Sequence, residues 1–331
     1  MPISQTELAR RLKLSKCTVS KALRNDPAVA EETRKKVQSL AKSLDYVINP
    51  HLSAIAANRF RNAKSSAKEN IAFIHNPYQK EDRIESLAAA QERAYETGYT
   101  LTEFCLNDYQ NNQQLDRILY SRGIRGLIIG TISHPRFRLD LKWNRYAVLG
   151  CQTNLEIFPF SRFSISWFRA VSDILRDIRK QGYKKIGTIL LEHPSIEEEF
   201  APQCGAVEWF RRKSSGDSLL PSLILEQQDH GEVFHYLEKY RPDALLVQNV
   251  GQYYLIKDYL IKKGRKIPPI ASIYLPPQHT EIAGIYQNWR QTTIEAVNEL
   301  DRMLRTGLLG KPEFIREIVM NHSFYRANVF N

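Results

Sequence analysis

SKCTVSKALR, residues 15–24, is the stretch that decides how the chain begins to fold. Ser15 can cap a helix that starts at Lys16, because a serine hydroxyl accepts a hydrogen bond from an early helix amide. Three apolar side chains recur three and four residues apart and would form one buried face: Val19, Ala22 and Leu23. The opposite, polar face would carry Lys16, Cys17, Ser20 and Lys21. The stretch therefore predicts a short amphipathic helix whose basic side chains point outward.

Two further short helices flank this run. Ser4-Gln5-Thr6-Glu7 is a capping box, in which the serine accepts from an early amide and the glutamate reaches back to the cap amide. A third helix is predicted over residues 31–44, after the turn-like Asn25-Asp26-Pro27. Three short helices, the first two joined by a tight turn, form a helix-turn-helix unit, whose second helix enters the major groove of DNA.

Positive charge is concentrated in the same part of the chain. Of the net charge of +11, residues 1–64 carry +8 (13 Lys and Arg against 5 Asp and Glu), and the other 267 residues carry +3 (34 against 31). A basic segment on a nearly neutral body is typical of nucleic-acid binding, although a segment that binds a membrane surface has the same signature. Lysines on the outward face of the second helix can donate to guanine O6 and N7, but a merely solvated helix face also carries lysines.

Length and composition limit the class of protein. The 331 residues are enough for two or three packed units, and 43% hydrophobic with 25% charged residues is usual for soluble globular chains. No window approaches about 18 consecutive apolar residues, and charges stand where a signal peptide would be apolar, so a cytoplasmic location is expected. The four cysteines are widely separated, and we find no common catalytic, nucleotide-binding or metal-ligand motif. We therefore expect no enzyme activity, no metal and no cofactor.

The ordered motifs of the first 46 residues resemble one family. Thr18-Val19-Ser20-Lys21-Ala22-Leu23 is similar to the T-V-S-R-A-L signature of the lac repressor (LacI/GalR) family of bacterial transcriptional regulators. VAEETR, residues 29–34, resembles the V-S-E-E-T-R that opens the family's third helix, and Leu44-Asp45-Tyr46 resembles its L-G-Y. The sequence departs from the pattern at three positions: Lys13 in place of a turn glycine, Ala30 in place of a capping serine, and Lys21 in place of arginine.

The resemblance implies roles for particular residues. The family's reading helix corresponds here to Lys16, Cys17, Thr18, Ser20 and Lys21, with Lys16, Cys17 and Lys21 at base-reading positions; Arg24 and Thr33 occupy backbone-contacting positions. Residues 46–64 resemble the family's hinge, whose short helix enters the minor groove when DNA is bound. There Asn49 matches the family's asparagine, Ile55 stands in place of the leucine wedge, Leu52 falls on a small-residue position, and Pro50 comes one residue late. An apolar wedge of this kind kinks the duplex; a plain linker helix is the alternative.

From Ile71 onward, short apolar runs alternate with amphipathic stretches. Strands are expected near 71–74, 101–106, 126–130, 186–191 and 244–247, and helices near 83–96, 113–122, 203–212 and 252–263. Two similar strand-and-helix series predict parallel sheets in two α/β halves. The resemblance implies the same architecture, a core like a periplasmic sugar-binding protein with a ligand between two lobes. The expected fold is multidomain: an all-α helix-turn-helix head at 1–48, a hinge and linker at 49–69, and a two-lobed α/β core at 70–331.

The residues expected between the lobes depart from the family pattern. His75-Asn76-Pro77-Tyr78 resembles the loop after the family's first strand, but Pro202 replaces a common arginine, Asn249-Val250 replaces N-D, and Tyr274 replaces an aspartate. Charged groups usually hold sugar hydroxyls, so their loss argues against an ordinary hexose and favours an aromatic, less polar or unusually bound ligand, such as a carbohydrate derivative, or none. The candidate lining residues are Asn76, Tyr78, Gln203, Asn249, Tyr274 and Gln287.

These features predict a sequence-specific DNA-binding transcriptional regulator that acts as a repressor in the cytoplasm, associated with the nucleoid. Its partners would be double-stranded operator DNA, a second copy of the chain in a homodimer, and a small-molecule effector that changes the relative positions of the two heads. One alternative is a regulator of the same family whose cleft no longer binds a ligand. A DNA-tethered enzyme would need convergent catalytic groups that we do not find in the sequence.

Overall fold

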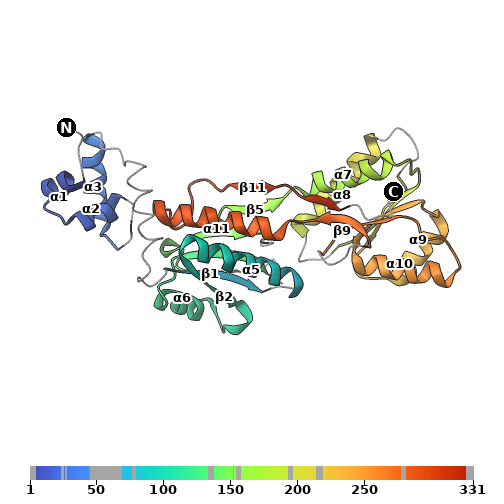
Figure 1. Cartoon of the computed structure of the whole chain (residues 1–331), viewed down its shortest axis with the longest axis horizontal. Helices are drawn as coiled ribbons and strands as arrows, with labels where there is room; N and C mark the ends of the chain where they lie inside the picture. The colour runs from blue at the N-terminus through green and yellow to red at the C-terminus, as the bar shows by residue number, and fades with distance from the viewer. Residues whose placement is uncertain are drawn as a thin grey trace.

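The computed structural model describes residues 5–23, 26, 28–44, 69–76, 80–132, 138–151, 153, 158–192, 197–213, 219–276 and 281–325, with the backbone alone at 5–6, 16–17, 80–84 and 197–198. Figure 1 shows a small helical head and a longer body in which two α/β lobes lie end to end. The described residues include no helix that is long and apolar enough to cross a membrane. The expected fold class, a helix-turn-helix head and a two-lobed α/β core, is confirmed.

The head consists of α1 (Gln5–Leu12), α2 (Lys16–Leu23) and α3 (Glu31–Ser43). Its core is small and fully apolar, with Leu8, Val19, Ala22 and Val37 completely buried. The turn after α1 is closed by a hydrogen bond from the Leu14 amide to the Ala9 carbonyl, 3.0 Å long, across Lys13 at φ 51°. This left-handed conformation costs a non-glycine residue about 1–2 kcal/mol. The departure at Lys13 therefore introduces strain into the turn of the helix-turn-helix.

The first lobe is a six-stranded, fully parallel sheet in the order β11-β5-β4-β3-β1-β2. Its strands are β1 (Glu69–Asn76), β2 (Tyr99–Cys105), β3 (Gly126–Ile132), β4 (Ala147–Cys151), β5 (Arg162–Ile165) and β11 (Glu317–Met320). Its helices are α5 (Lys80–Thr97), α6 (Asn112–Ser121) and α11 (Trp289–Thr306), with short 3-10 turns at η1 (Leu106–Asp108) and η2 (Trp143–Arg145). Side chains of β3 alternate between the two cores, with Ile128 packed on the α5 and α11 face and Ile129 on the α6 face.

The second lobe repeats this plan in the order β12-β10-β9-β8-β6-β7, with only β12 antiparallel to its neighbour. Its strands are β6 (Ile186–Leu191), β7 (Leu223–Leu225), β8 (Ala244–Asn249), β9 (Ile270–Tyr274), β10 (Ala283–Tyr286) and β12 (Ser323–Tyr325). Its helices are α7 (Trp167–Lys180), α8 (Glu197–Lys213), α9 (His230–Tyr240) and α10 (Val250–Lys262). Helices α7 and α8 cover one face, and α9 and α10 cover the other.

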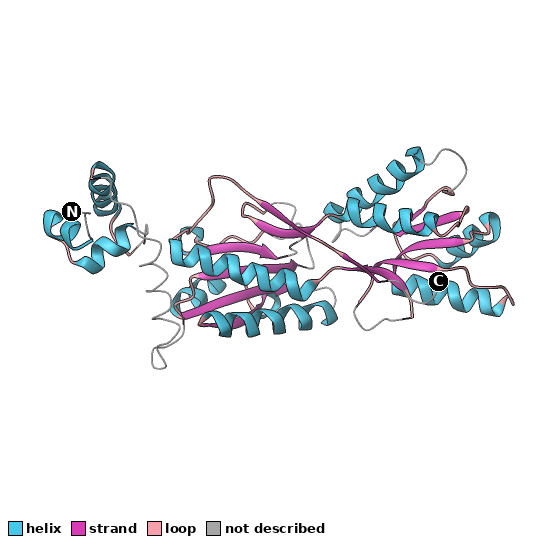
Figure 2. Ribbon diagram, turned by 45° about the horizontal axis from the view of Figure 1, so that its top comes forward, coloured by secondary structure: helices cyan, strands magenta, loops and turns pink. Residues whose placement is uncertain are grey.

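The chain crosses between the lobes three times: from β5 to α7, from β10 to α11, and from β11 to β12 (Figure 2). Strands β5 and β11 enter a crossing at their carboxyl ends, and both run parallel to the rest of the first sheet. Strand β10 does the same in the second sheet. It follows that the carboxyl ends of both parallel sheets face each other across the crossings. We call the residues at these ends the inter-lobe edge, the usual position of ligands in open α/β sheets.

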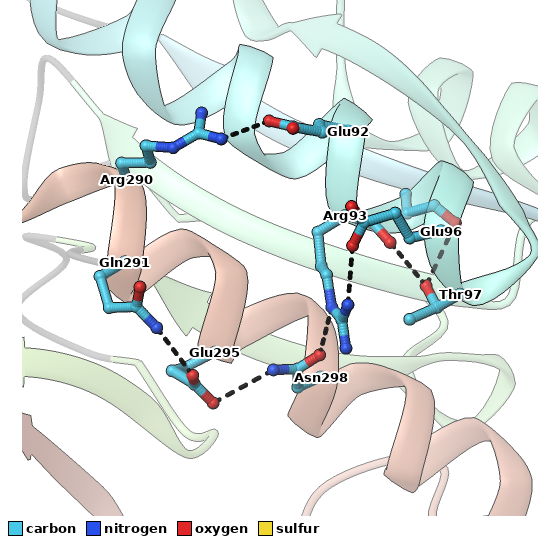
Figure 3. A network of polar contacts seen from close by, with 9 residues as sticks. Glu92, Arg93, Glu96, Thr97, Arg290, Gln291, Glu295 and Asn298 are labelled. Atoms are coloured by element: carbon cyan, nitrogen blue, oxygen red, sulfur yellow. Dashed lines mark hydrogen bonds and ion pairs between the residues drawn. The ribbon is translucent and has the colours of Figure 1, made fainter.

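Helices α5 and α11 are joined by a network of polar side chains on the surface of the first lobe (Figure 3). Arg93 of α5 donates to Asn298 of α11 over 2.6 Å, and Arg290 of α11 pairs with Glu92 of α5. Asn298 in turn donates to Glu295 over 3.2 Å. Because α11 begins directly after the second crossing, this network couples that crossing to α5.

One predicted element differs clearly from the structure. The sequence suggested a helix beginning near Gln203, after Pro202, whereas α8 begins at Glu197 and contains the proline. Proline lacks an amide hydrogen, so Pro202, the sixth residue of α8, removes one backbone hydrogen bond, and its ring crowds the carbonyl four residues before it. The longer helix places Glu199 one turn before Gln203, which affects the chemistry of the inter-lobe edge.

Candidate DNA-reading head and inter-lobe site

Helix α2 is held at its first turn by a side-chain cap. The Ser15 hydroxyl accepts from the Thr18 amide over 3.0 Å and lies 2.8 Å from the Thr18 hydroxyl. Thr18 is therefore engaged in capping, as well as belonging to the predicted reading helix. Ser20 and Lys21 lie further along α2 and are half-buried. The backbone of Lys16 and Cys17 forms the first turn, but their side chains lie outside the described residues.

Helix α3 begins without a side-chain cap, as expected from Ala30 in place of serine. Glu31 and Glu32 in its first turn complement the positive end of the helix dipole. Each forms an ion pair one turn on, with Lys35 and Lys36, and these lysines hold the pKa values of both carboxyl groups below their ordinary range. Thr33 is half-buried in the same turn. Arg24 and the hinge residues Asn49, Leu52 and Ile55 lie outside the described residues.

Part of the positive charge of the head is already neutralised. Glu7 accepts hydrogen bonds from Arg10 and Arg11 at 2.8 to 2.9 Å, and these contacts lower its pKa to about 2. The carboxylate therefore stays ionised across the usual pH range. Phosphate contacts would have to come mainly from the other basic side chains of the head.

On the first lobe, the inter-lobe edge is formed by the ends of β1 and β2. Asn76 donates to the side-chain oxygen of Asn107 over 3.0 Å. The buried His75 ring lies beside it, with Nε2 2.6 Å from a Glu103 carboxylate oxygen. Asn76 is thus at the edge where the sequence placed it, whereas Tyr78 lies outside the described residues.

On the second lobe, a chain of hydrogen bonds joins two of the predicted residues. Gln203 is fully buried and donates from Nε2 to the Tyr274 hydroxyl over 3.2 Å. Its Oε1 accepts from Gln248 over 2.8 Å. The Tyr274 hydroxyl in turn donates to the carboxylate of Glu199. The structure therefore brings Gln203 and Tyr274 together, and adds a carboxylate that sequence reasoning did not include.

Asn249, the third predicted residue of this lobe, caps α10. Its side-chain oxygen accepts from the Gln252 amide over 3.1 Å. This contact occupies one lone pair of that oxygen. Its position at the carboxyl end of β8 agrees with the prediction, but its evident role is structural.

Two buried amides at this edge have unsatisfied atoms. Gln287, 4% exposed, directly follows β10, and its Oε1 has no hydrogen-bond partner among the described residues. Gln252 is completely buried in the first turn of α10, and its Nε2 likewise has no hydrogen-bond partner among the described residues. A buried polar atom without a partner costs about 1–3 kcal/mol, so ordered water or a ligand is the usual reason for one.

The sequence missed several residues of this edge: Glu199, Gln248, Gln252 and Trp167. The Trp167 ring packs against Tyr274 with centroids 4.8 Å apart. Gln248 immediately precedes Asn249, so the position of the strand end could have identified it. Glu199 had no such signal, because a helix was not expected before Pro202.

Asn288 connects two of the three crossings. It has a left-handed backbone, φ 51°, and its side chain donates to the Asn321 carbonyl over 2.9 Å while accepting from Ser323 over 3.1 Å. Tyr286, at the end of β10, donates to Glu85 of α5 over 2.6 Å and so links the two lobes directly. Burial is the main cause that raises the pKa of Tyr286 above its ordinary value. These contacts would have to shift together in any movement between lobes.

Other features of the surface do not coincide with this edge. A pocket of about 290 Å³ in the first lobe is lined by Val148, Met303 and Phe314, and one of about 330 Å³ in the second lobe by Leu223, His235 and Tyr240. Within the part of the chain that the structure describes, no three acidic, histidine or cysteine side chains are grouped as metal ligands.

The comparisons with known proteins agree with this geometry. Residues 6–49 match the family model described as "Bacterial regulatory proteins, lacI family". The chain is 24% identical over 276 residues to the NTD biosynthesis operon regulator NtdR of Bacillus subtilis (strain 168), an alignment that covers 79% of this chain and 78% of that one.

Two solved structures show the same fold at low sequence identity. The lac repressor dimer bound to operator and the anti-inducer ONPF is matched over 100% of this chain and 99% of its own, with TM-score 0.59 and 15% identity. A periplasmic binding protein/LacI transcriptional regulator from Alkaliphilus metalliredigens QYMF, complexed with D-xylulofuranose, is matched over 78% of this chain and 97% of its own, with TM-score 0.53 and 14% identity.

Proposed function

We propose that this chain is a transcriptional regulator of the lacI family, a repressor that binds operator DNA as a homodimer in the cytoplasm and responds to a small molecule at its inter-lobe edge. The observation that carries the proposal is the helix-turn-helix with its own apolar core at residues 5–43, within the 6–49 family match. Two such heads would bind a two-fold-symmetric DNA site. The centres of its two half-sites would be separated by one turn of the DNA helix or a multiple of it.

In this proposal, α2 reads the major groove. Lys21 and the first-turn residues Lys16 and Cys17 would face base edges, while Arg24 and Thr33 would contact phosphates. Ser20 is placed on the same helix, and Thr18 would combine its capping bond with a DNA contact. The capped first turn of α2 supports this, because it fixes the direction in which the reading side chains leave the helix.

The segment after the head would act as a hinge. Asn49, Leu52 and Ile55 would enter the minor groove, with Leu52 or Ile55 as the apolar wedge. The net charge of +8 over residues 1–64 supports close approach to DNA along this whole stretch. We propose the corresponding domain limits: a head at 1–48, a hinge and linker at 49–69, and a core at 70–331.

The effect of a bound ligand on the DNA-binding heads would be transmitted through the three crossings. A ligand that binds at the facing strand ends would favour one relative position of the lobes over another. The Asn288 and Tyr286 contacts join the crossings to each other and to α5. Movement of the first lobe would then change the spacing of two heads in the dimer.

A regulator without a ligand is the second candidate. The chain from Gln248 through Gln203 and Tyr274 to Glu199 satisfies most polar groups of the second lobe internally. The unpartnered atoms of Gln287 and Gln252 favour a ligand instead. Melting temperatures measured with and without candidate ligands distinguish a ligand-responsive regulator from one without a ligand, because a ligand that binds only the folded state must raise the melting temperature.

Replacing Lys21 and Arg24 separately should give different losses of DNA affinity. Lys21→Ala should cost about 1–3 kcal/mol at particular operator positions and relax the base preference there, because it removes a base-edge contact. Arg24→Ala should weaken all duplexes to a similar degree, because it removes a phosphate contact. Affinities for an operator and its single-base variants separate the two patterns. Equal losses on every duplex for both variants would contradict a reading role for α2.

A further inference from the structure

Basic side chains are concentrated at one end of the second lobe. The last turns of α7, α8, α9 and α10, with the turns that follow three of them, form four stretches: residues 177–185, 210–213, 237–243 and 259–269. These stretches hold 13 Lys and Arg against 3 Asp and Glu, whereas the other residues of the body, from 65 to 331, hold 21 against 28. The small net charge of the body therefore conceals a strongly basic region, which we call the distal basic patch.

Contacts between the turns make the distal basic patch one continuous surface. Asp243, before β8, accepts from the backbone amides of Lys184 and Lys185, before β6, over 2.9 and 2.8 Å. Glu238, near the end of α9, pairs with Arg265, before β9, over 3.1 Å. Helices α7 and α8 pack into one core beside these turns. Two of the three acidic side chains of the patch are therefore occupied in holding its turns together.

Most basic side chains of the patch are exposed. Only Arg211 and Arg265 are half-buried, because each also contacts neighbouring chain segments. Among the described residues, ion pairs at the patch involve arginines and no lysine, for example Arg211 with Glu208 and Arg265 with Glu238. The lysines are therefore accessible to an anion from outside the chain.

The helix dipole explains only part of this charge. Cations in the last turn of a helix complement its negative end, which accounts for Lys180 and Lys262. The effect falls off beyond the last turn, so it does not account for Lys184, Lys185 and Lys266, which lie past the helix ends. These lysines give the patch more charge than its helices need.

The distal basic patch and the head lie at opposite ends of the molecule (Figure 1). Strands β6, β8 and β9 begin at the patch and run parallel toward the inter-lobe edge. The head lies at the amino end of the first sheet, since Arg125, directly before β3, comes within 3.9 Å of Asp26. Because the carboxyl ends of the two sheets face each other, their amino ends point away from each other. DNA bound by the heads would therefore leave the patch open to a separate polyanion.

We infer that the distal basic patch is a second DNA-binding surface, which contacts the phosphates of another duplex segment without reading its sequence. The inference rests on the proposed function, because operator DNA held by the heads brings flanking duplex to a high effective concentration. Eight of the 13 basic residues are lysines, which act on phosphates as point charges, whereas guanine is read best by two-pronged contacts. The helices also end here, and helix-turn-helix proteins contact bases with the amino-terminal residues of a helix. The protein would thus bridge two duplex segments.

The test asks whether the full chain, held on operator DNA, captures a second duplex. Operator duplex is tethered to beads, loaded with less than one dimer per operator and washed, and a labelled duplex of unrelated sequence is then added. We expect capture, because the heads are occupied and the patch is not. The affinity for the labelled duplex should fall about a hundredfold between about 50 and 200 mM salt if about four phosphates are neutralised.

A charge-reversing variant and its matched control locate the binding. Lys184→Glu combined with Lys263→Glu should raise the Kd for the labelled duplex at least about tenfold, because repulsion replaces two phosphate contacts. Arg117→Glu combined with Lys142→Glu makes the same change of charge at exposed positions of the first lobe and should leave that Kd unchanged. Retention of each variant on the operator beads shows that it is folded and that its heads bind DNA.

The outcomes separate this inference from the function on which it rests. Capture of the labelled duplex by the Lys184 and Lys263 variant, equal to that by the unmodified chain, would overturn it. Absence of capture by protein that is retained on operator would also overturn it. Stronger binding to vesicles that contain phosphatidylserine than to the labelled duplex would overturn it by assigning the patch to a membrane surface. Failure of the unmodified chain to stay on operator beads would instead contradict the proposed function.

Discussion

Removal of residues 1–64 should abolish specific DNA binding while leaving the two lobes folded. Specific and non-specific affinities of DNA-binding proteins typically differ by about 10³ to 10⁷, and the removed segment holds the whole helix-turn-helix and +8 of the +11 net charge. A mobility-shift titration of the fragment against the full chain measures the loss. For the full chain, affinity should also fall steeply with salt, with a logarithmic slope of about 6 to 10 if a dimer neutralises that many phosphates.

The fragment should fold because the head and the lobes have separate cores. Leu8, Val19 and Val37 pack in a cluster that contains only head residues, and no buried cluster of the described body includes one. A thermal unfolding transition close to that of the full chain is the control. A folded fragment that retained most of the operator affinity would contradict the assignment of DNA binding to the head.

Gly284→Ala should be among the most destabilising single changes in the second lobe. A Cβ at this position would lie 2.5 Å from the Ser272 carbonyl oxygen and 3.0 Å from Leu275 Cβ. The carbonyl belongs to β9, the strand that pairs with β10, and cannot move without breaking that pairing. Overpacking against backbone should lower the free energy of unfolding by about 3 kcal/mol, as measured by urea unfolding.

Gly205→Ala is the matched control for this substitution. Gly205 lies inside α8, is exposed, and its added Cβ would meet only Phe168 at 3.9 Å. Alanine should therefore stabilise the protein by about 0.5–1 kcal/mol through helix propensity. Equal effects of the two changes would mean that β9 and β10 are not as closely packed as described, and that the second crossing is not held in place by this pairing.

The head was predictable because its signals are local. Capping residues, a three-to-four-residue apolar spacing and a short turn specified α1, α2 and α3 to within a residue or two of the structure. Even the strain at Lys13 could be anticipated, because a turn that usually has glycine was occupied by another residue. The two sheets could be predicted as a class because short apolar runs alternate with amphipathic stretches along the sequence. Gly98 and Gly182, which lie between a helix and the next strand, adopt a positive φ.

The inter-lobe edge was predictable only in part, because it depends on contacts between distant segments. The sequence indicates Gln203 and Tyr274, 71 residues apart, as candidates, but their hydrogen bond and the contact of Tyr274 with the Glu199 carboxylate depend on how α8 packs against β9. Asn249 is a candidate because it follows a strand, and the same position makes it a helix cap. The side-chain contacts of Asn288 and Tyr286 at the crossings could not be predicted, because their partners come from the last crossing and from α5.

Selection of binding sites from a pool of random DNA duplexes by the full chain tests the central claim most directly. The claim is that the head reads sequence and that two heads act as a pair. We expect one two-fold-symmetric sequence to be enriched, with its base preference relaxed at defined positions in both half-sites when Lys21→Ala is selected in parallel. Recovery of a pool with no enriched sequence, from protein that binds duplex DNA, would contradict it.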